Sequence, residues 1–126
     1  VPIRVEDHGP IREIVLDRPA KMNALRDEDF VAFTRIAEET ARSGARAVLI
    51  RGEGGNFCAG RDIASTDPAA LDGEKLIRTE INPLFKAIRA IPVPTVAAID
   101  GVCLGGGFGI AFACDILLAA DDARPG

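Results

Sequence analysis

The sequence predicts an α/β fold built from repeated units in which two short strands precede a helix. Two β-rich runs open the chain at residues 2–7 and 11–17, and apolar runs of strand length follow at 47–50, 95–99 and 116–120. Segments with apolar residues at helical spacing separate these runs. The order ββ-α-β(β)-α-β-α-β favours repeated ββα units over a simple doubly wound sheet. The length of 126 residues is enough for one domain, over residues 1–126.

The first half of the chain predicts a hairpin, a helix and a strand. His8-Gly9-Pro10 separates the two opening runs and marks a turn, so we interpret His8 as a solvated turn residue. Acidic residues begin the helix that is expected over about 27–42, and Gly44 ends it. The run at 47–50 is continuously apolar and bounded by glycines, which is typical of a buried strand.

The second half contains two further helices and two strands. A short extended piece at 57–63 bends at Gly60, and the polar segment 64–73 is expected to be a loop. Helical spacing over 74–90 predicts a helix that Pro83 should kink or split. The strand at 95–99 then leads into three consecutive glycines, a helix with small residues and the last strand.

Composition and charge exclude several classes of function. The net charge is −4 without a block of Lys or Arg, so neither a nucleic-acid surface nor a membrane patch is expected. Three cysteines in apolar or glycine-rich surroundings predict reduced thiols and a cytoplasmic protein. A single histidine and no zinc-binding spacing argue against a protein-ligated metal. Both ends of the sequence are abrupt, which we interpret as a sign that it is a piece of a longer protein.

The glycine triplet Gly105-Gly106-Gly107 is the clearest candidate for a functional loop. Glycines at a helix start expose backbone N–H groups at the positive end of the helix dipole, where a phosphate, a carboxylate or an oxyanion can bind. The spacing fits neither a dinucleotide-binding fingerprint nor a P-loop, because Gly107 stands where a P-loop needs Lys. The loop has no serine for a nucleophile elbow. Tight packing of the helix explains the triplet equally well at this point.

Other segments carry motifs that occur together in a fixed order: Leu16-Asp17-Arg18-Pro19-Ala20-Lys21-Met22-Asn23-Ala24-Leu25, then Phe57-Cys58-Ala59-Gly60-Arg61-Asp62-Ile63, then Ile91-Pro92-Val93-Pro94-Thr95-Val96-Ala97-Ala98-Ile99-Asp100-Gly101, and Leu104-Gly105-Gly106-Gly107 with Ala113-Cys114-Asp115. In order and spacing they resemble the crotonase (enoyl-CoA hydratase/isomerase) superfamily over essentially the whole chain. The resemblance implies a crotonase-like spiral of repeated ββα units, truncated before the C-terminal helical region.

The resemblance also implies a site. Two backbone N–H groups, those of Arg61 and Gly106, would stabilise the oxyanion of an acyl-CoA thioester. Lys21 is a candidate phosphate contact or simply an exposed lysine, and the Arg61 side chain is a candidate phosphate or adenine contact. Asp62 is expected to orient its loop, and Asp115 to join the last helix to the last strand. The residues expected to bind the substrate and its coenzyme A are Lys21, Ala24, Leu25, Ala59, Gly60, Asp62, Ile63 and Gly105.

The same resemblance implies no separate cofactor, because coenzyme A is part of the substrate. It implies a homotrimer or a dimer of trimers for the full-length protein, and lyase or isomerase chemistry in fatty acid metabolism.

Gly109 departs from the family pattern. Hydratases of this family carry the first of two catalytic glutamates two residues after the triplet, and here that position is glycine. The second glutamate would lie beyond Gly126. Glycine can neither hold a water nor shuttle a proton. Three interpretations follow: an isomerase or other family enzyme with its acid elsewhere, an atypical hydratase, or a catalytically silent acyl-CoA-binding or scaffold protein.

Overall fold

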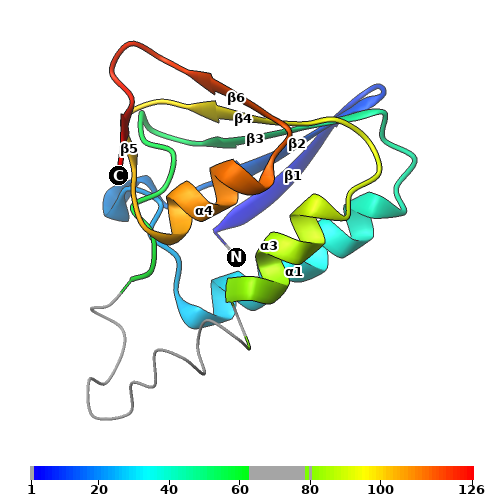
Figure 1. Cartoon of the computed structure of the whole chain (residues 1–126), viewed down its shortest axis with the longest axis horizontal. Helices are drawn as coiled ribbons and strands as arrows, with labels where there is room; N and C mark the ends of the chain where they lie inside the picture. Colours follow the sequence, from blue (N-terminus) through cyan, green and yellow to red (C-terminus); the bar gives the residue numbers. More distant parts are fainter. Residues whose placement is uncertain (1, 63–78, 80) are drawn as a thin grey trace.

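A computed structural model describes residues 2–62, 79 and 81–126. A five-stranded sheet with the order β1-β2-β3-β4-β6 organises it (Figure 1). Strands β1 (Ile3–His8) and β2 (Ile11–Leu16) form the predicted antiparallel hairpin. Strands β3 (Ala47–Gly52), β4 (Thr95–Ile99) and β6 (Ile116–Ala119) continue the sheet in parallel from β2.

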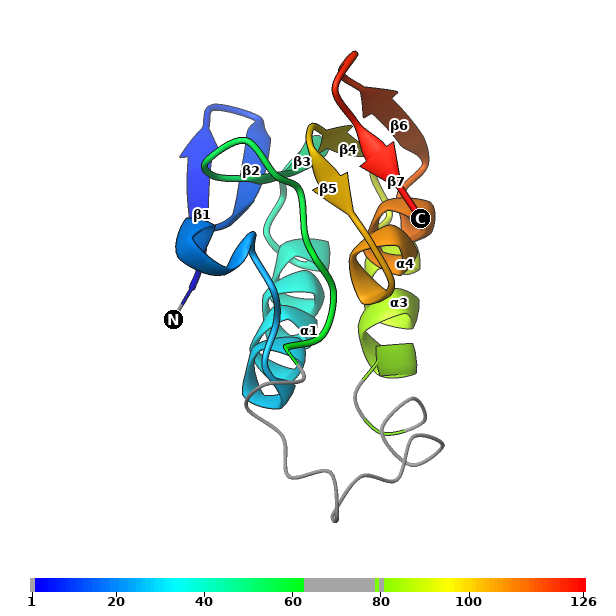
Figure 2. The same cartoon turned by 90° about the vertical axis from the view of Figure 1, so that its left-hand side faces the viewer.

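A second, smaller ladder confirms that the strands come in pairs. Strand β5 (Val102–Cys103) follows β4 and pairs in parallel with β7 (Arg124–Pro125), which follows β6. Cys58, which follows β3, forms a parallel bridge with Cys103 on the other side of β5. Figure 2 shows β5 and β7 lying side by side in front of the main sheet. Each parallel strand from β3 onward is thus followed by a short extended piece in the second ladder, which is the repeated ββ unit predicted from the sequence.

The helices cover one face of the main sheet. Helix α1 (Asp27–Ala41) lies beside α3 (Asn82–Arg89), and α3 packs against α4 (Gly106–Ala113) (Figures 1 and 2). A short 3₁₀ helix, η1 (Pro19–Lys21), follows β2. The core between helices and sheet is apolar; its largest fully buried side chains include those of Phe30, Phe33, Phe57, Ile14, Ile50, Leu84, Ile88 and Ile110.

Two predictions about these elements can be compared with the structure. Pro83 lies in the first turn of α3, and the described residues 79 and 81 before that helix have π-helical backbone, so the type of helix changes at the predicted interruption. The expected loop 64–73, residues 74–78 and 80 of the expected helix 74–90, and Ile63 lie outside the described residues. In β3, Val48 and Ile50 are buried while Leu49 and Arg51 are half-buried, so this strand is fully buried on one face.

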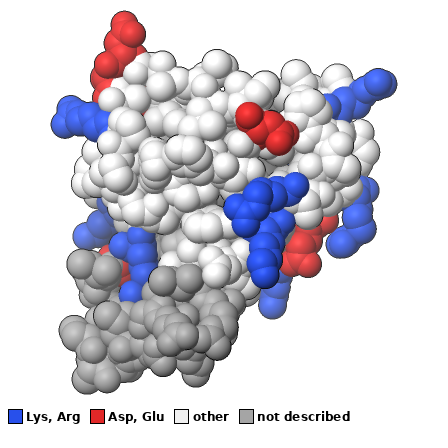
Figure 3. Space-filling view, in the orientation of Figure 1, with Lys and Arg blue, Asp and Glu red and all other residues white. Residues whose placement is uncertain are grey.

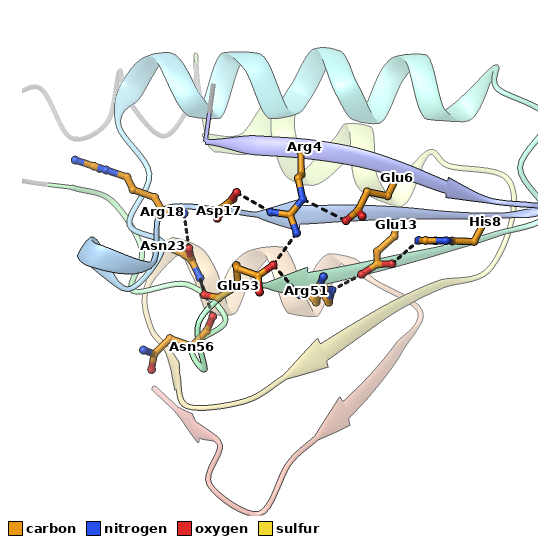
Figure 4. Close-up of polar contacts among 10 residues, drawn as sticks. All are labelled: Arg4, Glu6, His8, Glu13, Asp17, Arg18, Asn23, Arg51, Glu53 and Asn56. Carbon is orange, nitrogen blue, oxygen red and sulfur yellow. Dashed lines mark hydrogen bonds and ion pairs between the residues drawn. The ribbon is translucent and has the colours of Figure 1, made fainter.

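The outer face of the sheet is polar over β1, β2 and β3 (Figure 4). Arg4 contacts the carboxylates of Glu6, Asp17 and Glu53. Arg51 pairs with Glu13, which also accepts a contact of 3.0 Å from His8 Nε2. His8 is exposed at the hairpin end, as predicted. In the described ranges 2–62, 79 and 81–126, no helix has the length and apolar character needed to cross a membrane.

Candidate functional site

The loop after β3 and the start of α4 meet at Gly60. Its backbone has φ +97°, and a methyl group added to it would lie 2.8 Å from the carbonyl oxygen of Leu104 and 3.4 Å from the backbone nitrogen of Gly106. Only glycine adopts this conformation at low cost and lets two backbones come so close. The two segments that were predicted to supply N–H donors are therefore in direct contact.

Gly106 is the first residue of α4, and its N–H lies at the positive end of the helix dipole. Its neighbours are already engaged: Gly107 N donates to Leu104 O at 2.9 Å, and Gly105 N donates to Gly126 O at 3.2 Å. The Gly106 N–H donates no hydrogen bond to any residue in the part of the chain that the structure describes. The geometry therefore presents one helix-terminal N–H beside the Gly60 loop.

The three glycines of the triplet have different tasks. A methyl group on Gly107 would lie 2.4 Å from the carbonyl oxygen of Cys58, so this glycine is required by packing. Gly105 has φ +53° and open space around it, so it sets the direction of the backbone. Gly106 presents the N–H described above. The two explanations that the sequence left open, tight packing and ligand binding, apply to different residues of the triplet.

Backbone hydrogen bonds join the loop after η1 to the Gly60 loop. Ala59 N donates to Met22 O at 2.9 Å, Leu25 N to Gly60 O at 2.7 Å, and Asp62 N to Leu25 O at 2.7 Å. The structure thus brings the predicted residues around Leu25 and Gly60 together. The side chains of Ala24 and Leu25 are buried in the core, so these two residues can offer a ligand mainly their backbone.

Asn23 holds this arrangement, a role that its place in the Leu16–Leu25 motif did not predict. Its buried side chain accepts a hydrogen bond from Arg18 N (2.7 Å) and donates to the carbonyl oxygens of Glu53 (3.0 Å) and Asn56 (2.8 Å) (Figure 4). Asn23 and the preceding Met22 have φ values of +59° and +50°. The available signal was the residue type, since asparagine tolerates this left-handed conformation better than most residues.

Charged side chains around the loops are mostly paired. Arg18 forms an ion pair of 2.9 Å with Asp62 and also donates to Ala24 O, which agrees with the expectation that Asp62 orients its loop. The Arg61 guanidinium pairs with Asp27 at the start of α1, at 2.9 and 3.3 Å. A phosphate or adenine contact from Arg61 would therefore compete with this carboxylate. Lys21 is exposed and forms no ion pair with the described residues.

The remaining candidate groups have structural roles or lie elsewhere. The Asp115 carboxylate accepts hydrogen bonds from Thr95 N (3.0 Å) and Oγ1 (3.3 Å), so it ties the end of α4 to β4, and not only to the following strand as predicted. Burial raises the pKa of the Cys58 thiol to about 12 and that of Cys103 to about 11. Residues 2–62, 79 and 81–126 contain no group of His, Cys, Asp or Glu side chains suited to a metal.

The geometry described so far defines a class: an α/β spiral of paired strands whose glycine loops bring backbone donors together. Comparison with known proteins then identifies the family. The sequence profile of the Enoyl-CoA hydratase/isomerase family matches residues 6–126. A probable enoyl-CoA hydratase of Rhodobacter capsulatus is 38% identical over 96% of this chain and 47% of its own length. The chain therefore belongs to the enoyl-CoA hydratase/isomerase family, within the crotonase superfamily.

Other relatives agree. A mitochondrial Delta(3,5)-Delta(2,4)-dienoyl-CoA isomerase of Dictyostelium discoideum is 33% identical over 90% of this chain and 43% of its own length. The crystal structure of an enoyl-CoA hydratase/carnithine racemase from Magnetospirillum magneticum superposes with a TM-score of 0.91 and 32% identity, covering 100% of this chain and 49% of the other. This superposition confirms the crotonase fold. The chain spans about half the length of the relatives it matches.

Proposed function

We propose that the protein binds an acyl-CoA thioester and stabilises its oxyanion with the backbone N–H groups of Arg61 and Gly106. The close approach of Gly60 to the start of α4, where a methyl group added to Gly60 would lie 3.4 Å from the Gly106 nitrogen, carries this proposal, because it brings together the two segments that would supply the donors. Donors fixed in place where negative charge develops are worth far more than donors that must reorganise. The ladder hydrogen bonds on both sides of Gly60 provide that fixation.

In this proposal the thioester carbonyl lies at the N-terminus of α4. Negative charge that develops on its oxygen, as a proton leaves the carbon beside the carbonyl or as the double bond is attacked, is met by the two N–H groups and the helix dipole. Lys21, exposed at the end of η1, is the proposed contact for a phosphate of coenzyme A. No further cofactor is proposed, since coenzyme A belongs to the substrate.

The type of reaction follows from Gly109. Helix α4 carries no ionisable side chain, so it supplies neither an acid nor a base. We therefore favour an isomerase or an atypical hydratase, with the proton-transferring group outside α4. The same absence on α4 favours a second candidate, a catalytically silent acyl-CoA-binding or scaffold protein. Measured turnover of enoyl-CoA esters separates the two.

We further propose a cytoplasmic homotrimer, or a dimer of trimers, for the full-length protein. Its support is the apolar surface of β6 and α4, which includes Leu118 and Phe112, with 59% and 62% exposure. Figure 3 shows that the surface over α4 itself is uncharged, although Lys and Arg side chains lie over α3 on the same face. A partner subunit or a further part of the chain would remove this apolar area from water.

The central test uses the full-length protein, isothermal titration calorimetry with acetoacetyl-CoA, and an activity screen against short enoyl-, dienoyl- and aryl-CoA esters. Gly106→Pro deletes the proposed donor at the first helical position, where proline is tolerated. Gly106→Ala keeps the N–H and serves as the matched control. If the screen finds turnover, Gly106→Pro should lower kcat/KM by roughly 10²–10³-fold, as for other oxyanion donors.

Circular dichroism must show that both variants are folded. Absence of acetoacetyl-CoA binding to the unmodified protein would overturn the proposal as a whole. Equal activity of folded Gly106→Pro and Gly106→Ala would overturn the role of this N–H. Binding without turnover of any ester would support the silent alternative.

A further inference from the structure

An aromatic ring fills the space next to Gly109. A methyl group added to Gly109 would lie 2.2 Å from Cζ, 2.7 Å from Cε2 and 3.0 Å from Cε1 of Phe85. These distances are far below van der Waals contact, so no side chain at position 109 is compatible with the ring in its present place. Phe85 comes from α3 and packs, half-buried, against the apolar core.

Gly109 and Gly106 lie on the same face of α4, because they are three residues apart. A methyl group on Gly106 would meet a second ring, at 3.4 Å from Cζ of Phe30 on α1. One face of α4 is thus covered by two phenylalanine rings from two other helices. This face begins at Gly106, the proposed oxyanion donor, so the two rings form an apolar wall along the face that starts there.

An apolar wall at this place has a chemical consequence. A carboxylate beside the Phe85 ring would lose hydration without gaining a partner on α4, since this helix has no ionisable or hydroxyl side chain. A water held there would lack hydrogen-bond partners for the same reason. The packing of Phe85 and the glycine at 109 therefore belong together: the ring takes the volume that an acid would need.

We propose that Phe85 is a specificity-determining residue whose ring occupies the place of a side chain at position 109 and disfavours the addition of water to the substrate. The inference rests on the proposed acyl-CoA function and names its substrate class, unsaturated acyl-CoA esters that are isomerised. In isomerisation a proton leaves one carbon of the acyl chain, the double bond shifts, and a proton returns at another carbon. No water is consumed, whereas hydration adds H and OH across the double bond.

The test asks whether removal of the ring permits hydration by a new acid. Gly109→Glu, Phe85→Ala and the double variant Phe85→Ala/Gly109→Glu are made in the full-length protein. Phe85→Ala/Gly109→Gln is the matched control, equal in size to the double variant but unable to accept a proton. Phe85→Val/Gly109→Glu gives a second double variant in case the alanine variant does not fold. Each protein is assayed for acetoacetyl-CoA binding, crotonyl-CoA hydration and 3-enoyl-CoA isomerisation.

The expected result is a gain in crotonyl-CoA hydration of at least about tenfold in the glutamate double variants, against no gain in Gly109→Glu or in the glutamine control. The gain should rise with pH as the new carboxylate ionises. A folded Gly109→Glu protein that hydrates as fast as the double variants would overturn the role of the ring. Double variants that bind acetoacetyl-CoA without any gain would overturn it as well.

The proposed function fails separately from this inference. If the unmodified protein binds no acetoacetyl-CoA, both fall, since the wall would then face no thioester. If the unmodified protein and the glutamate variants bind acetoacetyl-CoA equally well, the rate of crotonyl-CoA hydration alone tests the proposed role of Phe85. Isomerisation in the unmodified protein at a higher rate than hydration is the third expected observation, and the reverse order would contradict the assigned substrate class.

Discussion

Replacement of Asn23 by alanine should strongly destabilise the loops that form the candidate site. The side chain is 1% exposed and makes three hydrogen bonds, to Arg18 N, Glu53 O and Asn56 O. Each such bond contributes about 1 kcal/mol to stability. Alanine at φ +59° adds a cost of about 1 kcal/mol for the left-handed conformation. The expected loss in the free energy of unfolding is therefore about 3–4 kcal/mol.

Urea unfolding of the full-length protein, followed by circular dichroism, measures this loss from the midpoint and the slope. Asn23→Gly is the matched control, because glycine removes the same hydrogen bonds but accepts the backbone conformation. It should be more stable than Asn23→Ala by about 1 kcal/mol. A loss below about 1 kcal/mol for Asn23→Ala would refute the reasoning, since it would mean that water or a shifted loop replaces all three bonds.

Three further predictions concern packing and ionisation. Gly107→Ala should lower the free energy of unfolding, measured in urea, by more than about 2 kcal/mol, because the methyl group would lie 2.4 Å from Cys58 O. The matched variant Gly106→Ala should lower it far less. Similar losses in the two variants would contradict the role of packing at Gly107. The hydrogen bond from Arg51 lowers the pKa of Glu13 below its ordinary value of 4.5. Glu13→Gln should therefore lower the free energy of unfolding by up to about 1 kcal/mol at pH 7. The difference between the two proteins should vanish once the pH has fallen below the lowered pKa of Glu13. Buried Cys58, with a pKa of about 12, should resist iodoacetamide at pH 8 until the protein unfolds, as read by peptide mass spectrometry.

The ionisation predictions have clear opposing results. The pairing of Glu13 with Arg51 adds stability above pH 4.5, and this contribution disappears as the pH falls because the carboxylate becomes neutral. A Glu13→Gln penalty that is unchanged at acid pH would show that charge has no part in it. Rapid alkylation of Cys58 in the native protein would show that its burial is frequently interrupted.

Local signals in the sequence were sufficient for most of the fold. The hairpin turn at His8-Gly9-Pro10, the acidic start of α1 and the β-branched run of β4 each depend on neighbours in the chain. Pro83 was correctly expected to interrupt a helix, but its place in the first turn of α3 depends on where that helix packs. The pairing of Cys58 with Cys103 could not be predicted, because it joins residues from different repeats.

The candidate site was predictable as motifs and not as contacts. The glycines Gly60 and Gly106 stood out in the sequence, and their proximity confirms that the two loops meet. Asn23 and Phe85 were not selected as site residues, because a buried amide or an aromatic ring acts here through distant partners. Arg61 illustrates the same limit: its side chain was considered for coenzyme A, and the structure pairs it with Asp27.

The parallel β-bridge between Cys58 and Cys103 has a consequence for the geometry of the proposed oxyanion site. Each proposed donor lies three residues after one partner of the bridge: Arg61 after Cys58 and Gly106 after Cys103. A glycine with positive φ precedes each donor, with +97° at Gly60 and +53° at Gly105. The two N–H groups therefore occupy equivalent positions in successive repeats, separated by one inter-strand step of about 4.8 Å at the bridge. The proposed site would thus take its two N–H groups from corresponding places in two repeats, each after a glycine with positive φ, and the parallel bridge would set their spacing.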